Sequence, residues 1–118
     1  MKRTAIFALL LASCGSSSEV VIDDGVGSGN KYTISKSVSR SGGFAEAITM
    51  SGYEDGHDRS VVIFDCNRIL YRDKSSEYFG YYDGRYEEWG ETEWTNAPEG
   101  SKIHKALAYA CFDILPSD

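Results

Sequence analysis

Apolar side chains recur at every second position along most of this chain, and this alternation constrains its fold more than any other feature. Residues 60–66 are the clearest case, because Val62, Phe64 and Cys66 share one face of the strand that the spacing predicts. A period of two is typical of half-buried β-strands. We expect further strands at residues 19–24, 31–38 and 44–50. Residues 77–86 are expected to form aromatic strand segments around a hairpin turn, and residues 87–94 to continue them as an acidic, aromatic edge.

Turn-forming residues separate these expected strands. Residues 40–43 contain two glycines and predict a hairpin between strands 31–38 and 44–50. Asp83 and Gly84 form a dipeptide that is typical of hairpin turns. The polar residues 52–59, which include His57, are expected to form a solvent-exposed loop.

The end of the chain follows the period of a helix. Residues 102–115 begin after Ser101, a good N-cap residue, and Cys111 lies at the margin of their apolar stripe. This stripe contains Ile103, Leu107, Ala110 and Ile114. We therefore predict an α+β fold, in which an antiparallel β-sheet of about five to six strands packs against one C-terminal helix.

The first residues resemble a bacterial lipoprotein signal. Lys2 and Arg3 precede an apolar run at residues 5–12, which is too short to span a bilayer. The run ends in Leu-Ala-Ser-Cys, a lipobox-like sequence that predicts lipidation of Cys14. The alternatives are an ordinary secretory signal or a buried N-terminal strand. We expect a signal peptide at residues 1–13, a lipid-anchor tether at 14–18 and a single domain at 19–118.

Charge and size restrict the function classes. The 118-residue chain has a net charge of -6. Without residues 1–13 the charge becomes -8, because ten basic residues remain against 18 acidic ones. Such an acidic chain is a poor nucleic-acid binder. Gly15, in place of an aspartate that would retain a lipoprotein at the inner membrane, favours an outer-membrane location, with the lipid on Cys14 as the membrane contact.

Cys66 and Cys111 remain as a pair once Cys14 carries lipid. In an exported chain a disulfide is the default interpretation, and it would close a loop of about 45 residues. A reactive thiol and a metal-binding pair are the alternatives.

No catalytic or cofactor motif stands out. The glycine-rich residues 25–29 lack the last glycine of a dinucleotide-binding loop, because Asn30 occupies that position. His57 and His104 are too far apart for a metal motif, and the acidic run at residues 83–93 lacks the spacing of a calcium loop. We expect no enzymatic activity, no metal and no cofactor.

Aromatic residues supply the candidate binding surface. Tyrosine and tryptophan provide large contact areas at low entropic cost. The alternative is that these rings cover the sheet through cross-strand pairs. The candidate residues are Tyr78, Tyr81, Tyr82, Trp89 and Trp94.

Residues 61–112 resemble the surface-adhesin protein E-like domain of bacterial lipoproteins. The resemblance depends on Asp65-Cys66 at a strand end, Trp94 before the Pro-x-Gly-Ser helix start at 98–101, and an alanine-rich helix that ends near Cys111. It implies an antiparallel sheet on a C-terminal helix with a Cys66–Cys111 disulfide. It also implies a surface lipoprotein that binds host extracellular-matrix and serum proteins.

Two functions follow as hypotheses. The first is a lipid-anchored, adhesin-type module that binds a protein partner, such as a host extracellular-matrix component or another basic protein. The alternative is a periplasm-facing inhibitor or accessory lipoprotein, for example one that binds a basic enzyme such as lysozyme. Edge strands rich in tyrosine and serine would also allow a homodimer.

Overall fold

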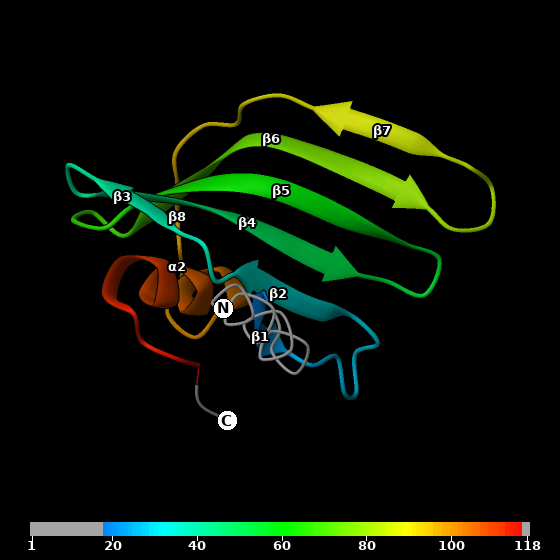
Figure 1. Ribbon diagram of the computed structural model, residues 1–118, viewed down its shortest axis with the longest axis horizontal. Coiled ribbons are helices and arrows are strands. Elements are labelled where there is room, and N and C mark those ends of the chain that lie inside the picture. Colours follow the sequence, from blue (N-terminus) through cyan, green and yellow to red (C-terminus); the bar gives the residue numbers. More distant parts are fainter. Residues whose placement is uncertain (1–17, 117–118) are drawn as a thin grey trace, which may run out of the picture.

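The computed structural model describes residues 18–116, which form one antiparallel sheet and one helix (Figure 1). The sheet has eight strands in the order β1-β2-β4-β5-β6-β7, with β3 paired to β4 and β8 paired to β6. The strands are β1 (Glu19–Asp23), β2 (Lys31–Ser35), β3 (Ser39–Ser41), β4 (Phe44–Gly52), β5 (Gly56–Asp65), β6 (Leu70–Gly80), β7 (Tyr86–Trp89) and β8 (Thr95–Asn96), and the helix is α2 (Lys102–Phe112). The predicted architecture is confirmed, and the two very short strands β3 and β8 account for the larger strand number.

One expectation about strand boundaries needs correction. Residues 52–59 are not a loop, because β4 continues to Gly52 and β5 begins at Gly56. Only residues 53–55 turn, and His57 pairs with both Gly52 and Phe79. The polar residues can join the sheet because its end extends beyond the helix, where strand side chains need no apolar cover. The hairpin around Asp83 and Gly84 is confirmed.

The hydrophobic core lies between α2 and one face of the sheet, which we call the inner face. Phe64 and Ile34 are fully buried there against Leu107 of the helix. Ala45 and Ala47 of β4 lie under the helix, whose own buried residues include two more alanines. These small side chains allow close packing of helix and sheet. The opposite face, the outer face, has no helix over it in residues 18–116.

The helix ends earlier than expected. Ser101 is the N-cap, and its Oγ accepts a hydrogen bond from the His104 N–H at 3.2 Å. Asp113 adopts a left-handed conformation with φ of 60°, and the Ile114 N–H bonds back to Ala108 O. This cap ends the helix at Phe112. Ile114 therefore lies outside the apolar stripe and is exposed.

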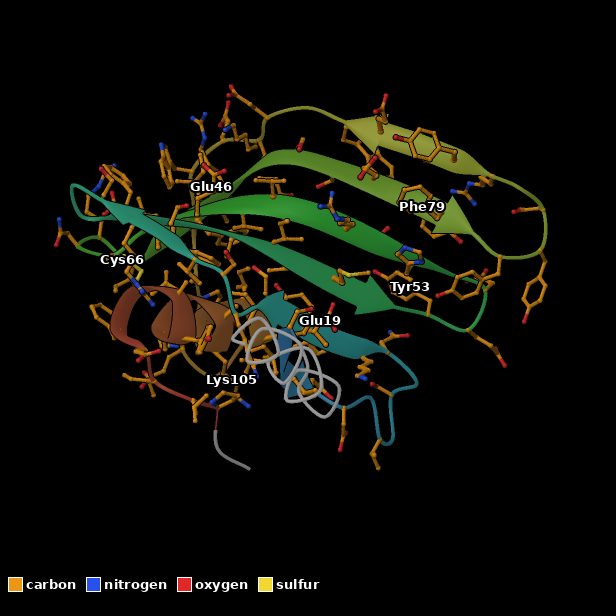
Figure 2. The ribbon with its side chains drawn as sticks, in the orientation of Figure 1. Glu19, Glu46, Tyr53, Cys66, Phe79 and Lys105 are labelled. Carbon is orange, nitrogen blue, oxygen red and sulfur yellow. A yellow bond between two sulfur atoms is a disulfide. The ribbon has the colours of Figure 1, made fainter. Side chains whose placement is uncertain are left out.

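Cys66 and Cys111 form a disulfide that joins the end of β5 to α2, as predicted (Figure 2). Their Cα atoms are 5.5 Å apart. The buried Asp65 organises the adjacent turn, since its carboxylate accepts hydrogen bonds from the N–H groups of Asn67 and Arg68 and from Arg68 Nε. These bonds, led by that from the Arg68 guanidinium, lower the pKa of Asp65.

The proposed signal peptide, Cys14 and most of the tether lie outside the described residues. The first described residue, Ser18, is tied to the sheet because its main-chain oxygen accepts a hydrogen bond from Lys36 N at 2.8 Å. No helix within residues 18–116 is long and apolar enough to cross a membrane.

Candidate functional site

Two turns that are distant in sequence meet at the end of the sheet away from α2 (Figure 1). Residues 53–55 connect β4 to β5, and residues 81–85 connect β6 to β7. The Tyr81 N–H donates to Asp55 O at 2.9 Å, which joins the two turns. We call residues 53–55 and 81–85 together the distal tip.

The second turn is fixed by its own polar groups. The Asp83 carboxylate accepts a hydrogen bond from Arg85 N at 3.0 Å, and Gly84 has a φ of 68°. Gly80 has no room for a side chain, because the Asp83 carboxylate lies where its Cβ would be. The turn therefore holds Tyr81 and Tyr82 in defined positions rather than on a loose loop.

The distal tip combines exposed rings with acidic side chains. Tyr82 is 83% exposed and packs edge-to-face with Tyr81, whose ring centre is 6.4 Å away. Glu54, Asp55 and Asp83 supply negative charge. The pKa of Tyr78 is raised by burial and then by the charges of Asp55 and Asp83. The Arg85 guanidinium is already engaged, since it pairs with Glu87 at 2.6 Å and stacks over the Tyr78 ring.

A row of rings crosses the outer face next to the tip. Phe79 lies between His57 and Tyr86, with ring centres 5.0 and 5.1 Å away, and Tyr81 lies 5.7 Å from His57. His57 is thus part of an aromatic row and not of a solvated turn. The cross-strand register that forms this row, His57 opposite Phe79 opposite Tyr86, is a tertiary property that the sequence pattern did not reveal.

Acidic groups continue from this row along β6 and β7. The Tyr86 hydroxyl donates to Glu77 Oε1 at 2.7 Å and lies 2.9 Å from Glu88 Oε2. Arg59 pairs with the other oxygen of Glu77 at 3.3 Å. The hydrogen bond to Glu77 is the main cause that raises the pKa of Tyr86, followed by burial and by Glu88. The phenol therefore stays protonated and links the two carboxylates.

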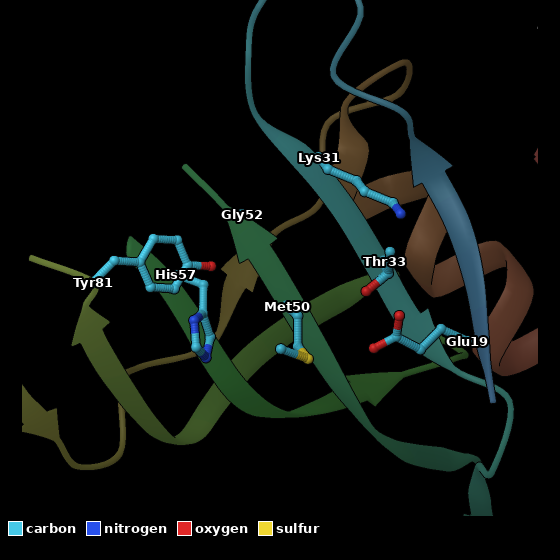
Figure 3. A pocket seen from close by; sticks show the side chains of 7 residues that line it. All are labelled: Glu19, Lys31, Thr33, Met50, Gly52, His57 and Tyr81. Carbon is cyan, nitrogen blue, oxygen red and sulfur yellow. The ribbon is translucent and has the colours of Figure 1, made fainter. Parts of the chain in front are cut away.

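A shallow pocket of about 240 Å³ opens on the outer face beside the tip (Figure 3). His57 and Tyr81 lie on one side of it, Lys31, Thr33 and Glu19 lie on the other, and Met50 lies between them. The pocket is large enough for one side chain and offers both apolar and charged walls.

The five aromatic residues that the sequence predicts as one binding surface do not lie together in the structure. Tyr78, Tyr81 and Tyr82 gather at the tip, and Trp89 lies about half exposed at the end of β7. Trp94 lies elsewhere, half-buried at the other end of the sheet. There its ring centre is 6.0 Å from that of Phe44 and 5.4 Å from the Arg72 guanidinium carbon. Trp94 therefore does not share a surface with the tyrosines of the tip, and Trp89 lies at the opposite end of β7 from them.

In the part of the chain that the structure describes, no three histidine, cysteine or acidic side chains gather in an arrangement that suits a metal ion. No family model matches the chain, and neither a curated protein nor a solved structure matches it significantly. The geometry of the tip is therefore the basis for a functional assignment.

Proposed function

We propose that this protein is a lipid-anchored, outer-membrane lipoprotein whose domain binds a protein partner through the distal tip. One observation carries the proposal: two hydrogen-bonded turns hold the exposed rings of Tyr81 and Tyr82 among carboxylates at one end of the sheet. Rigidly held tyrosines are favoured at protein interfaces because little side-chain entropy is lost on binding. The resemblance to surface-adhesin protein E-like domains supports an adhesin-type role.

The charge of the tip indicates the class of partner. Glu54, Asp55 and Asp83 favour a basic surface, which their field would also attract over longer distances. Host extracellular-matrix components with basic segments fit this chemistry. The alternative, a periplasm-facing inhibitor of a basic enzyme such as lysozyme, is supported by the same acidic charge.

The anchor would hold the domain close to the membrane. Ser18 lies four positions after Cys14, and an extended chain of four Cα–Cα steps reaches about 14 Å. Ser18 is bonded to Lys36 beside β1, so the β1 end of the sheet would be the part nearest to the lipid.

Accessibility on intact cells tests the proposal. Protease or antibody should reach the folded domain on unbroken cells, and Cys14→Ala should release it into the soluble fraction. Protection until the outer membrane is opened would contradict host binding. In that case, inhibition of lysozyme by the purified domain becomes the measurement that decides for the alternative.

Binding to a basic protein tests the tip itself. Tyr81→Ala with Tyr82→Ala should weaken the binding of basic matrix fragments. Phe112→Ala, which removes a similarly exposed ring at the end of α2, is the matched control and should leave binding unchanged. If both variants bind equally well, the distal tip is not part of the binding interface.

A further inference from the structure

The edge of β7 that faces away from β6 is an open strand edge, and the acidic side chains of Glu77 and Glu88 lie beside it. We propose that it accepts an extended, basic segment of a partner protein as an additional strand. This inference rests on the proposed binding function and names how the partner is held. Strand addition supplies affinity through main-chain hydrogen bonds and specificity through alternate side chains.

The hydrogen-bond pattern of the β6–β7 hairpin shows which main-chain groups of β7 are free to bind an added strand. The Gly80 N–H donates to Arg85 O at 2.8 Å, and bonding alternates along an antiparallel ladder. The main-chain N–H and C=O groups of Glu87, which lies opposite Tyr78, therefore form hydrogen bonds with β6. The N–H and C=O groups of Tyr86 and Glu88 point away from the sheet, and β7 is the last strand in the sheet order of residues 18–116.

Side chains on β7 define what the added strand should carry. Tyr86 and Glu88 project on the outer face, where Glu77 adds a second carboxylate. Glu87 and Trp89 project on the inner face, and the Trp89 ring is about half exposed. A strand with Lys or Arg opposite Glu88 would gain cross-strand ion pairs, while apolar residues would contact the exposed rings.

The same charges argue against a second copy of this chain as the occupant. Two β7 strands side by side would bring Glu87 and Glu88 of each copy close to those of the other. Like charges across a strand pair are destabilising. The edge is therefore protected against self-pairing and remains suited to a basic segment.

A shallow pocket lies at the end of β7, beside the middle of β6. It has a volume of about 470 Å³, and its lining includes Ser75, Glu77, Glu88 and Trp89. A partner strand that continues past Trp89 would place a side chain there, between two carboxylates and an indole. A long cationic side chain fits this lining, because its stem contacts the ring while its charge meets the carboxylates.

The opposite edge of the sheet lacks these features. The pairing of β1 with β2 is interrupted between Val21 and Asp23, and such irregularities disfavour a further strand. Asp23 is also engaged by Lys102 of α2 at 3.6 Å. Of the strands at the two ends of the main sheet order, β1 and β7, it is β7 that combines regular pairing with open main-chain groups and acidic side chains.

The test uses the full chain with Cys14→Ala, which cannot be lipidated, and a hexapeptide of alternating Lys and Val. Binding should shift the Tyr86 and Glu88 amide signals in NMR spectra and slow their hydrogen exchange. Two N-methylated versions, one methylated at the lysines and one at the valines, keep the charge and block opposite edges of the peptide. Strand addition requires that one of them binds at least about ten-fold more weakly than the other.

Protein variants provide the matched comparison. Glu88→Pro removes the outward N–H but no bond to β6, so the hairpin should still form. Glu88→Gln removes the charge alone. Peptide binding should fall further in Glu88→Pro than in Glu88→Gln. If the Glu88→Pro variant unfolds, the N-methylated peptides still test strand addition, and Glu88→Gln still tests the contribution of the charge.

Three outcomes overturn the inference in different ways. Equal binding of both N-methylated peptides would reveal charge attraction without strand addition, and the proposed function would survive. Binding of no basic probe, polylysine included, would overturn the strand addition and the proposed function together. Self-association that Glu88→Pro abolishes would identify a second copy as the occupant and contradict the basic segment.

Discussion

The Tyr86 hydroxyl donates a hydrogen bond to Glu77 across the β6–β7 hairpin at 2.7 Å. Glu77 also lies directly opposite Glu88 in the strand register, so two carboxylates of like charge are adjacent. The phenol lies within hydrogen-bond distance of both. This hydroxyl, together with the Arg59–Glu77 ion pair, thus offsets a repulsion that destabilises the edge hairpin.

Tyr86→Phe should therefore loosen the hairpin. The variant keeps the ring that packs on Phe79 but loses the shared donor, so only the Arg59–Glu77 ion pair still offsets the repulsion between Glu77 and Glu88. Amide hydrogen exchange at Tyr78 and Glu87 should become several-fold faster, while exchange in β4 stays unchanged. Unaltered exchange at the hairpin would mean that the hydrogen bond has no stabilising role.

The Asp65 carboxylate should stabilise the fold mainly above its ordinary pKa of 3.8. Its pKa is lowered in the folded chain, first by the hydrogen bond to the Arg68 guanidinium, so this stability is lost as the pH falls through the lowered value. Asp65→Asn should lower the unfolding midpoint at pH 7, and the difference from the unmodified chain should vanish in strong acid. Urea titrations at several pH values measure it, and a pH-independent difference would contradict the charge argument.

Loss of the Cys66–Cys111 bond should be costly for a domain of this size. The bond spans 45 residues, and chain entropy assigns such a loop about 4 kcal/mol. Replacement of both cysteines by alanine should lower the free energy of unfolding by roughly 2–4 kcal/mol in urea. Reduction of the unmodified chain should give a similar loss. If neither treatment changes the unfolding curve, the disulfide does not stabilise the fold by lowering the conformational entropy of the unfolded chain.

Leu107 and Ile114 provide a matched pair on and beyond the helix. Leu107 is 1% exposed and Ile114 is 55% exposed, although both belong to the stripe expected from sequence. Leu107→Ala should cost about 2–5 kcal/mol because it leaves a cavity under α2. Ile114→Ala should change the free energy of unfolding by less than about 0.5 kcal/mol. Equal effects in thermal unfolding would contradict the observed helix end.

Tyr32 should lose its hydroxyl proton at a higher pH than an ordinary tyrosine does. Burial, with a smaller contribution from Asp73, raises its pKa from 10.0 to about 12. The unfolded chain releases this proton first, so about 2–3 kcal/mol of stability is present below pH 10 and is lost as the pH rises towards 12. Tyrosinate absorbance of the unmodified chain and of Tyr32→Phe measures the step. A Tyr32 signal near pH 10 in the folded chain would contradict the burial.

Local patterns were sufficient for much of the fold. Alternation predicted the central strand that contains Val62 and Phe64, and Ser101 predicted the start of α2. Gly84 predicted the hairpin because its positive φ is accessible to glycine at little cost. The end of α2 was not predictable in this way, because Ile114 continues the apolar spacing and Asp113 terminates the helix regardless.

The candidate site was only partly accessible from sequence. Composition identified Tyr81, Tyr82 and Trp89 as surface aromatics, but it also grouped Trp94 with them. The role of His57 was missed, because a polar segment was taken for a loop and its partners Phe79 and Tyr86 come from two other strands.

Most element types were predictable from the sequence, because periodicity and capping residues act locally. A Cys66–Cys111 disulfide was its default interpretation, and the structure contains that bond. The contact between residues 53–55 and 81–85 and the open acidic edge of β7 became visible in the folded chain alone. These relationships depend on strand register. A shift of one residue reverses the face of every side chain without changing the alternation, so the pattern alone does not specify them.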